Sequence, residues 1–176
     1  MRTQNLKLQV ITISAIIFAL AIFRLLPHLP NVSPVAAMAL FGGAYFADKK
    51  LAFIVPFAAL LLSDLLLGLH NTMIFVYAGF ALTVIIGFMI KDRVSVTNTA
   101  FAVLASSVLF FLLTNFGAWM TSPLYTRTAE GLMQAYAAGI PFFQNSLIGN
   151  LVFAAIIFGG YHLLQKNVAA LRLEKI

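Results

Sequence analysis

One carboxylate, Asp64, lies inside the apolar stretch 51–71, which is long enough to cross a lipid bilayer. At ~1.5 Å per residue, Asp64 lies about 20 Å from Lys49 and Lys50, beyond the midpoint of a hydrocarbon core roughly 30 Å thick. A charged side chain at that depth costs about 2.5 kcal/mol or more, so it is expected to face a bundle interior or a wet cavity. Asp64 is therefore the first candidate for a functional residue.

Arg24 is a candidate partner for Asp64. It lies about 24 Å along the preceding apolar stretch 8–26, near the same end of the membrane core. Two interpretations of these residues stay open and are compatible with each other. The two side chains form a buried ion pair between the first and third helices, or they set the charge at the floor of a binding site.

The composition indicates an integral membrane protein. Of 176 residues, 62% are hydrophobic and 9% are charged, whereas soluble domains carry about 25% charged residues. The net charge of +6 comes from cations that flank apolar stretches, so nucleic acid is not expected as a partner. The chain has no cysteine, which excludes disulfides, a thiolate nucleophile and a cysteine-based metal site.

The hydrophobic pattern predicts an all-α protein with six transmembrane helices in one domain, residues 1–176. The predicted spans are 8–26, 34–47, 51–69, 73–90, 96–118 and 142–164. The long connection 120–141 is expected to hold a short helix, 129–138, that is capped by Thr128 and stopped by Gly139 and Pro141. All Lys and Arg residues except Arg24 and Arg127 fall on one side, so both termini are predicted to be cytoplasmic.

Polar side chains collect towards the opposite, extracytoplasmic side. Those at or near that face are His28, Asn31, His70, Asn115, Trp119, Gln144 and Asn145, and those somewhat deeper are Arg24, Asp64 and Asn150. The expected apolar backing is Phe116, Tyr125, Phe142 and Phe143. Mostly apolar walls with a few placed polar groups are typical of small-molecule sites. The alternative is that the amides of 115, 144, 145 and 150 only hydrogen-bond between helices, at about 0.6–2 kcal/mol each.

Motifs for catalysis and for cofactors are missing from the sequence. Two loop histidines without a carboxylate cluster do not predict a metal site. The chain has no HExxH, no GxSxG and no clustered carboxylate pair, so we expect neither enzymatic activity nor a cofactor. It also has no Walker motif, so energy for uphill transport has to come from an ATPase partner or an ion gradient, if transport is uphill at all.

The first helix carries Ala15 and Ala19, four residues apart on one face. Small residues at this spacing let another helix approach closely. The pair therefore indicates either ordinary packing within the bundle or a docking face for another protein.

Five segments together resemble a known family: RLLPHLPN at 24–31, PVAAMALFGGAYF at 34–46, SDLLLGLH at 63–70, TNFGAW at 114–119 and AGIPFFQN at 138–145. That family is an uncharacterised group of small six-span bacterial membrane proteins described as transport proteins. Its architecture is similar to that of the S components of energy-coupling-factor vitamin transporters. The resemblance implies a location in the bacterial cytoplasmic (inner) membrane and a vitamin-like ligand bound near the outer face.

The same resemblance places the ligand under three loops, which here are 27–33, 70–72 and 120–141. It also implies that Ala15 and Ala19 face a membrane coupling subunit that works with ATPases. Members of the family that the chain resembles commonly carry an acid at the position of Asn150. The ligand specificity of this chain is therefore expected to differ from theirs.

We therefore predict a substrate-binding membrane protein in contact with the lipid bilayer. Arg24 and Asp64 would set the charge, Asn115, Gln144 and Asn145 would hydrogen-bond, and Trp119 with the Phe residues would stack on the ligand. A solitary secondary transporter that uses Asp64 for proton coupling is one alternative. A structural subunit of a membrane complex is the other.

Overall fold

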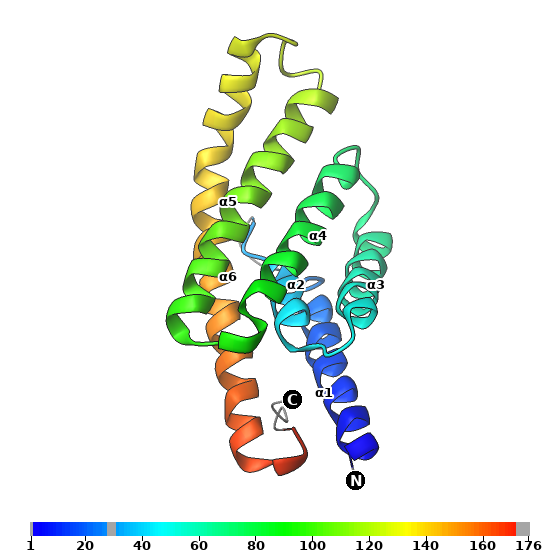
Figure 1. Ribbon diagram of the computed structural model, residues 1–176. Helices are drawn as coiled ribbons and strands as arrows, with labels where there is room; N and C mark the ends of the chain where they lie inside the picture. Colours follow the sequence, from blue (N-terminus) through cyan, green and yellow to red (C-terminus); the bar gives the residue numbers. More distant parts are fainter. Residues whose placement is uncertain (1, 28–30, 172–176) are drawn as a thin grey trace.

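The computed structural model describes residues 2–27 and 31–171, and within them it shows six α-helices (Figure 1). They are α1 (Arg2–Phe23), α2 (Val35–Tyr45), α3 (Lys49–Leu67), α4 (Met73–Ile90), α5 (Val96–Thr121) and α6 (Ala129–Asn167). Two 3-10 turns, η1 (Lys91–Arg93) and η2 (Ala169–Leu171), follow α4 and α6. No strand occurs in the described residues, so the predicted all-α class is confirmed.

Five of these helices, α1, α3, α4, α5 and α6, are long and apolar enough to cross a membrane. In the most apolar window of each, only 22–33% of the residues are buried inside the protein. The remaining apolar surface would be costly in water, where exposed apolar patches of this extent are rare, and it is compatible with lipid. The chain is therefore a multi-pass membrane protein.

The second predicted span, 34–47, contains a helix of only about half the ~20 residues that a membrane-spanning helix needs. With 11 residues, α2 is about 17 Å long, whereas the hydrocarbon core is about 30 Å thick. Every residue of α2 is buried, and α2 contacts each of the other five α-helices. It is the central element of the bundle (Figure 1) rather than a helix long enough to span by itself.

Glycines allow α2 to approach α4 closely. A Cβ atom on Gly43 would collide with the carbonyl oxygen of Val84, and a Cβ on Gly87 would lie 2.5 Å from the carbonyl oxygen of Leu40. At the end of α2, the Lys91 ammonium donates hydrogen bonds to the carbonyl oxygens of Phe46 (3.0 Å) and Ala47 (3.2 Å). A cation at a helix C-terminus satisfies carbonyls that have no partner within the helix.

The predicted stop in α6 is wrong. Instead of ending at Gly139, the helix that Thr128 caps continues through Pro141 to Asn167 for 39 residues. Proline inside a helix removes one hydrogen bond and costs about 3 kcal/mol, but packing on α5 offsets this cost. On one side of Pro141 the Tyr136 hydroxyl donates to the carbonyl oxygen of Leu112 (3.0 Å), and on the other the rings of Phe143 and Phe111 lie 5.0 Å apart.

The connection between α5 and α6 is consequently short, covering residues 122–128. The Thr128 hydroxyl accepts a hydrogen bond from the Gly131 N–H (3.2 Å), which confirms the predicted N-cap. Figure 1 shows the α5–α6 hairpin extending beyond the α3–α4 turn, and α1 beginning at the end of the molecule where α6 finishes.

The close approach of α2 and α4 leads to a prediction about stability. Replacing Gly43 by alanine should lower the free energy of unfolding by about 1–3 kcal/mol, because the new methyl group has no space against the α4 backbone. The control is Gly160→Ala in α6, where nothing lies within 4 Å of the added Cβ. Thermal unfolding of both variants in detergent would measure the difference. Equal unfolding midpoints would show that α2 and α4 can move apart to accommodate the methyl group without loss of stability.

Candidate functional site

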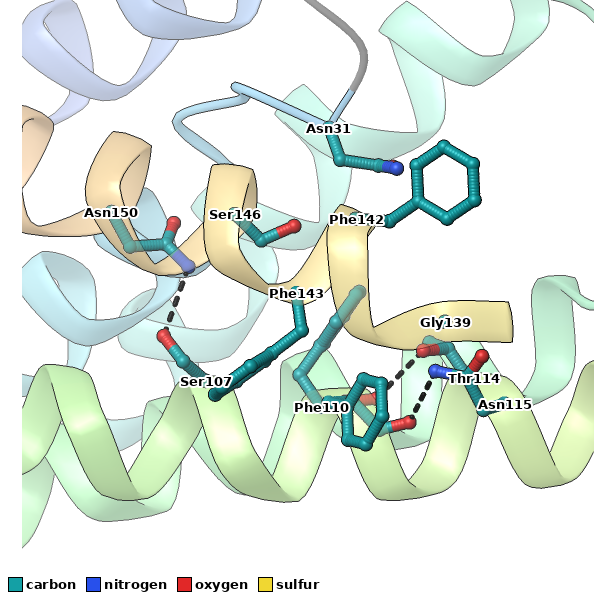
Figure 2. A pocket seen from close by; sticks show the side chains of 11 residues that line it. Asn31, Ser107, Phe110, Thr114, Asn115, Gly139, Phe142, Phe143, Ser146 and Asn150 are labelled. Atoms are coloured by element: carbon teal, nitrogen blue, oxygen red, sulfur yellow. Dashed lines mark hydrogen bonds between the residues drawn. The ribbon is translucent and has the colours of Figure 1, made fainter. Parts of the chain in front are cut away.

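A cavity of about 230 Å³ lies between α5, α6 and the segment that precedes α2 (Figure 2). Its walls combine amides, hydroxyls and phenyl rings. The lining residues are Asn31, Ser107, Phe110, Phe111, Thr114, Asn115, Gly139, Phe142, Phe143, Ser146 and Asn150. None of these described lining residues is charged, so the cavity offers hydrogen bonds and ring faces to a ligand but no ion pair.

Helical periodicity places the lining residues on facing sides of α5 and α6. On α5, the residues at 107, 110, 111, 114 and 115 recur at intervals of three and four, which defines one helix face. On α6, those at 139, 142, 143, 146 and 150 do the same. The two helices form a hairpin, so the two faces meet along the cavity (Figure 2).

Asn31 closes the cavity from a non-helical segment. Its φ angle of 63° lies in the left-handed region, which asparagine tolerates better than most residues, and this turn leads the chain into α2. The neighbouring residue Val32 packs on α6, where a Cβ on Gly149 would lie only 3.2 Å from the Val32 Cα. Glycine at 149 therefore allows an irregular backbone segment to lie directly against a spanning helix.

Three hydrogen bonds hold four of the polar side chains of the cavity (Figure 2). The Asn150 amide donates to the Ser107 hydroxyl (3.1 Å) and joins α6 to α5. Thr114 donates to the carbonyl oxygen of Phe110 (2.8 Å), and the Asn115 amide donates to that of Phe111 (2.8 Å). Because its nitrogen is used within the helix, Asn115 presents its side-chain oxygen towards Gly139, where a Cβ would collide with that oxygen.

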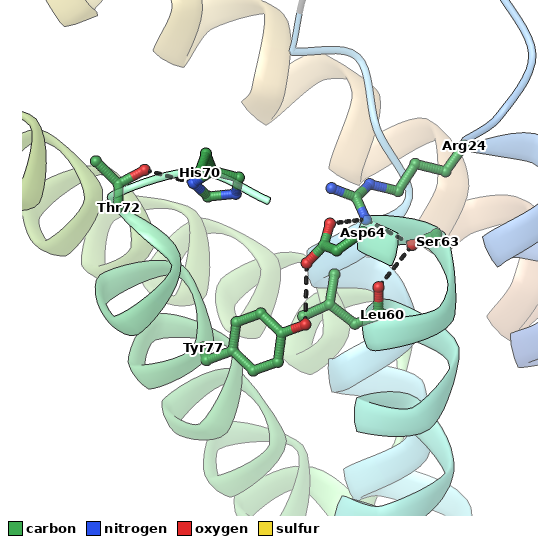
Figure 3. A network of polar contacts seen from close by, with 7 residues as sticks. All are labelled: Arg24, Leu60, Ser63, Asp64, His70, Thr72 and Tyr77. Carbon is green, nitrogen blue, oxygen red and sulfur yellow. Dashed lines mark hydrogen bonds and ion pairs between the residues drawn. The ribbon is translucent and has the colours of Figure 1, made fainter. Parts of the chain in front are cut away.

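Arg24 and Asp64 form an ion pair outside this cavity (Figure 3). The Arg24 Nη1 atom lies 2.5 Å from Asp64 Oδ1 and also donates to the Ser63 hydroxyl (2.5 Å). The Tyr77 hydroxyl donates to Asp64 Oδ2 (3.0 Å), which brings α4 into the network. The side chain of Asp64 is 1% exposed and that of Arg24 is 16% exposed. The network therefore ties the end of α1 to α3 and α4, as one of the two interpretations expected.

Trp119 and Tyr125 belong to the turn between α5 and α6. The Trp119 indole donates to the carbonyl oxygen of Thr126 (2.8 Å). The Arg127 guanidinium donates to the carbonyl oxygens of Trp119, Tyr125 and Ser122, and it lies 6.0 Å from the centre of the indole ring. These contacts stabilise the turn locally, so neither aromatic residue reaches the cavity.

The remaining predicted site residues are separate from the cavity lining. His70 is exposed and its Nδ1 atom lies 2.8 Å from the Thr72 hydroxyl (Figure 3). Gln144 is exposed and Asn145 is half-buried on α6. His28 falls outside the described residues. Ala15 and Ala19 lie on the exposed face of α1. Within residues 2–27 and 31–171, no three His, Asp or Glu side chains gather into a possible metal site.

Of the eleven predicted site residues, the cavity thus brings together Asn31, Asn115 and Asn150. The expected backing by Phe142 and Phe143 is also found there. The residues that the sequence reasoning missed are Ser107, Phe110, Phe111, Thr114, Gly139 and Ser146. Their intervals of three and four from Asn115 and Asn150 are a signal that could have identified them.

The fold and the cavity define a multi-pass helical membrane protein with an uncharged polar pocket between two of its helices. Residues 4–171 match the profile of a family of unknown function, DUF6580, and the chain belongs to that family. No curated protein and no solved structure matches the chain. The description of this family assigns no activity to its members.

The ion-pair network predicts unequal effects for its two charges. Replacing Arg24 by methionine should destabilise the protein by about 3–5 kcal/mol, because it leaves the deeply buried Asp64 carboxylate without its cation. Asp64→Asn should cost less, since the partly exposed Arg24 side chain can extend towards polar surroundings. Thermal unfolding in detergent compares the two. Equal losses, or a double variant no more stable than Arg24→Met alone, would contradict this account.

Proposed function

We propose that the protein binds a small, uncharged, partly polar molecule in the cavity between α5 and α6, as a step in the uptake of a vitamin-like or other nutrient compound. The observation that carries this proposal is the lining of the cavity, with amides and hydroxyls set among four phenyl rings in an otherwise apolar chain. Few placed polar groups on apolar walls are the usual composition of small-molecule sites.

The backbone around the cavity supports the proposal. Non-helical backbone inside a membrane is tolerated only where protein buries it or where it lines a polar cavity, because lipid offers no hydrogen bonds. Transport proteins commonly place their binding sites at such interrupted or short helices. Here Asn31, in the irregular segment that precedes the short α2, lines the cavity.

The size and chemistry of the cavity limit the ligand. A volume of about 230 Å³ is below the roughly 300–1,000 Å³ that is typical of ligand pockets, so a compound of one or two rings suits the space. The Asn115 oxygen and the hydroxyls of Ser146 and Thr114 favour a ligand with N–H or O–H donors. The phenyl rings favour a flat ligand face.

The proposal also includes the orientation of the protein. With the basic ends of the helices in the cytoplasm, Ser107 and Asn115 lie about 17 and 29 Å from Val96, the start of α5, in the outer half of the bilayer core. The cavity is then placed for capture from the extracytoplasmic side of a bacterial inner membrane. Six crossings result if α2 and the segment before it together return the chain to the cytoplasmic side.

A coupling partner completes the proposal. Ala15 and Ala19 lie on the exposed face of α1, so they are available for close packing by a second membrane protein. This agrees with the architecture of an S component that delivers its ligand through a coupling subunit and ATPases.

The experiment that tests ligand binding is native mass spectrometry of the protein extracted gently from its own membranes. The wild type should retain a small molecule. Ser146→Leu should lose it, because the larger side chain fills the cavity and removes a hydroxyl. Gln144→Leu is the matched control, since residue 144 lies on the same helix but is exposed and outside the lining.

Three outcomes would separate the possibilities. Loss of the small molecule in Ser146→Leu alone supports the proposed site. Equal loss in both leucine variants would place the ligand elsewhere on α6. A wild-type chain that retains no small molecule and is recovered only with other proteins would overturn the proposal in favour of a structural subunit.

A further inference from the structure

A second space lies between α5 and α6, below the cavity described above. It is a mostly apolar groove of about 440 Å³ on the side of the bundle where α5 begins and α6 ends. On α5 its wall begins at Val96 and reaches Val103, and on α6 it runs from Leu151 to His162. At ~1.5 Å per residue, the α6 wall is about 17 Å long.

Small residues create this groove. Ala100 on α5 and Ala154, Ala155 and Gly159 on α6 line it, and a Cβ added to Gly159 would have open space around it. Val96 and Gly159 are exposed, so the groove opens to the outside of the bundle, where the membrane lies. Apolar atoms that border an empty space lose van der Waals contacts. A lipid chain would restore these contacts.

Apolar walls alone do not select an occupant, because lipid tails are as apolar as the side chains. Basic side chains beside the groove would select a lipid with an anionic head group. Arg93 is exposed, donates from Nε to the carbonyl oxygen of Met89 (3.4 Å), and directly precedes Val94 and Ser95, which line the groove. On α6, the lining residue His162 is followed four residues later by the exposed Lys166, on the same helix face. The only acid in the Lys91–Arg93 turn is Asp92, so cations outnumber acids in this turn.

We propose that this groove binds one anionic phospholipid, with an acyl chain along α5 and α6 and its phosphate at Arg93, His162 and Lys166. Basic pockets between transmembrane helices bind anionic lipid head groups, and such lipids concentrate in the cytoplasmic leaflet. The site is separate from the ligand cavity, so it does not depend on the proposed uptake function.

The test uses nanodiscs made from equimolar phosphatidylglycerol and phosphatidylcholine, from which the protein is released for native mass spectrometry. The wild type should retain one phosphatidylglycerol in preference to phosphatidylcholine. Gly159→Leu should lose this retained lipid, because the leucine side chain occupies the groove. Gly160→Leu is the matched control: it introduces the same residue at an exposed neighbouring glycine that also has open space but does not line the groove.

The charge is tested by Arg93→Gln, which should reduce the preference for phosphatidylglycerol about fivefold, the factor that one cation near an anionic surface contributes. Equal lipid retention by Gly159→Leu and Gly160→Leu would overturn the proposal. Wild-type protein that retains the two lipids in the proportion supplied, or that retains no lipid, would also overturn it.

Discussion

The constraint on which this structure depends is that lipid cannot satisfy backbone hydrogen bonds. Five helices are long and apolar enough to meet it by spanning the core, but α2 is too short to do so and is preceded by irregular chain. The bundle therefore encloses α2 completely and uses Gly43 and Gly87 to bring α4 against it, while Lys91 satisfies its terminal carbonyls. The polar cavity lies beside the irregular chain that precedes α2, where Asn31 meets α5 and α6.

The ion pair between Arg24 and Asp64 connects three helices of the bundle. Arg24 lies directly after α1, where the chain leaves the helix, and its pairing with Asp64 holds that exit against α3 while Tyr77 adds α4. The ion pair is thus a contact between helices and lies apart from the residues that line the cavity.

The sequence predicts the helical class and most of the helices, because long apolar stretches between charged turns have few alternatives in a membrane. The fourth span agrees at both ends, and Thr128 caps its helix as predicted. The predicted helix end at Gly139 and Pro141 was wrong, because local sequence signals for a helix end do not include the packing of α6 against α5. The cavity was predicted in part: Asn31, Asn115 and Asn150 lie in it, whereas Trp119, Gln144 and Arg24 do not line it. Depth along a helix can be counted from sequence, but the direction in which each face points depends on neighbours that the sequence does not identify.

The uninterrupted α6 has a consequence for how the protein is seated in its membrane. At ~1.5 Å per residue, its 39 residues extend about 58 Å, nearly twice the thickness of the hydrocarbon core. Even a strongly tilted helix of this length emerges from the core, and Figure 1 shows the hairpin end extending past its neighbours. The turn at its tip carries Leu124, which is 83% exposed, and an indole ring locked by Arg127. If α6 crosses the membrane once, this turn faces a single aqueous compartment, from which membrane-impermeant labels would reach it.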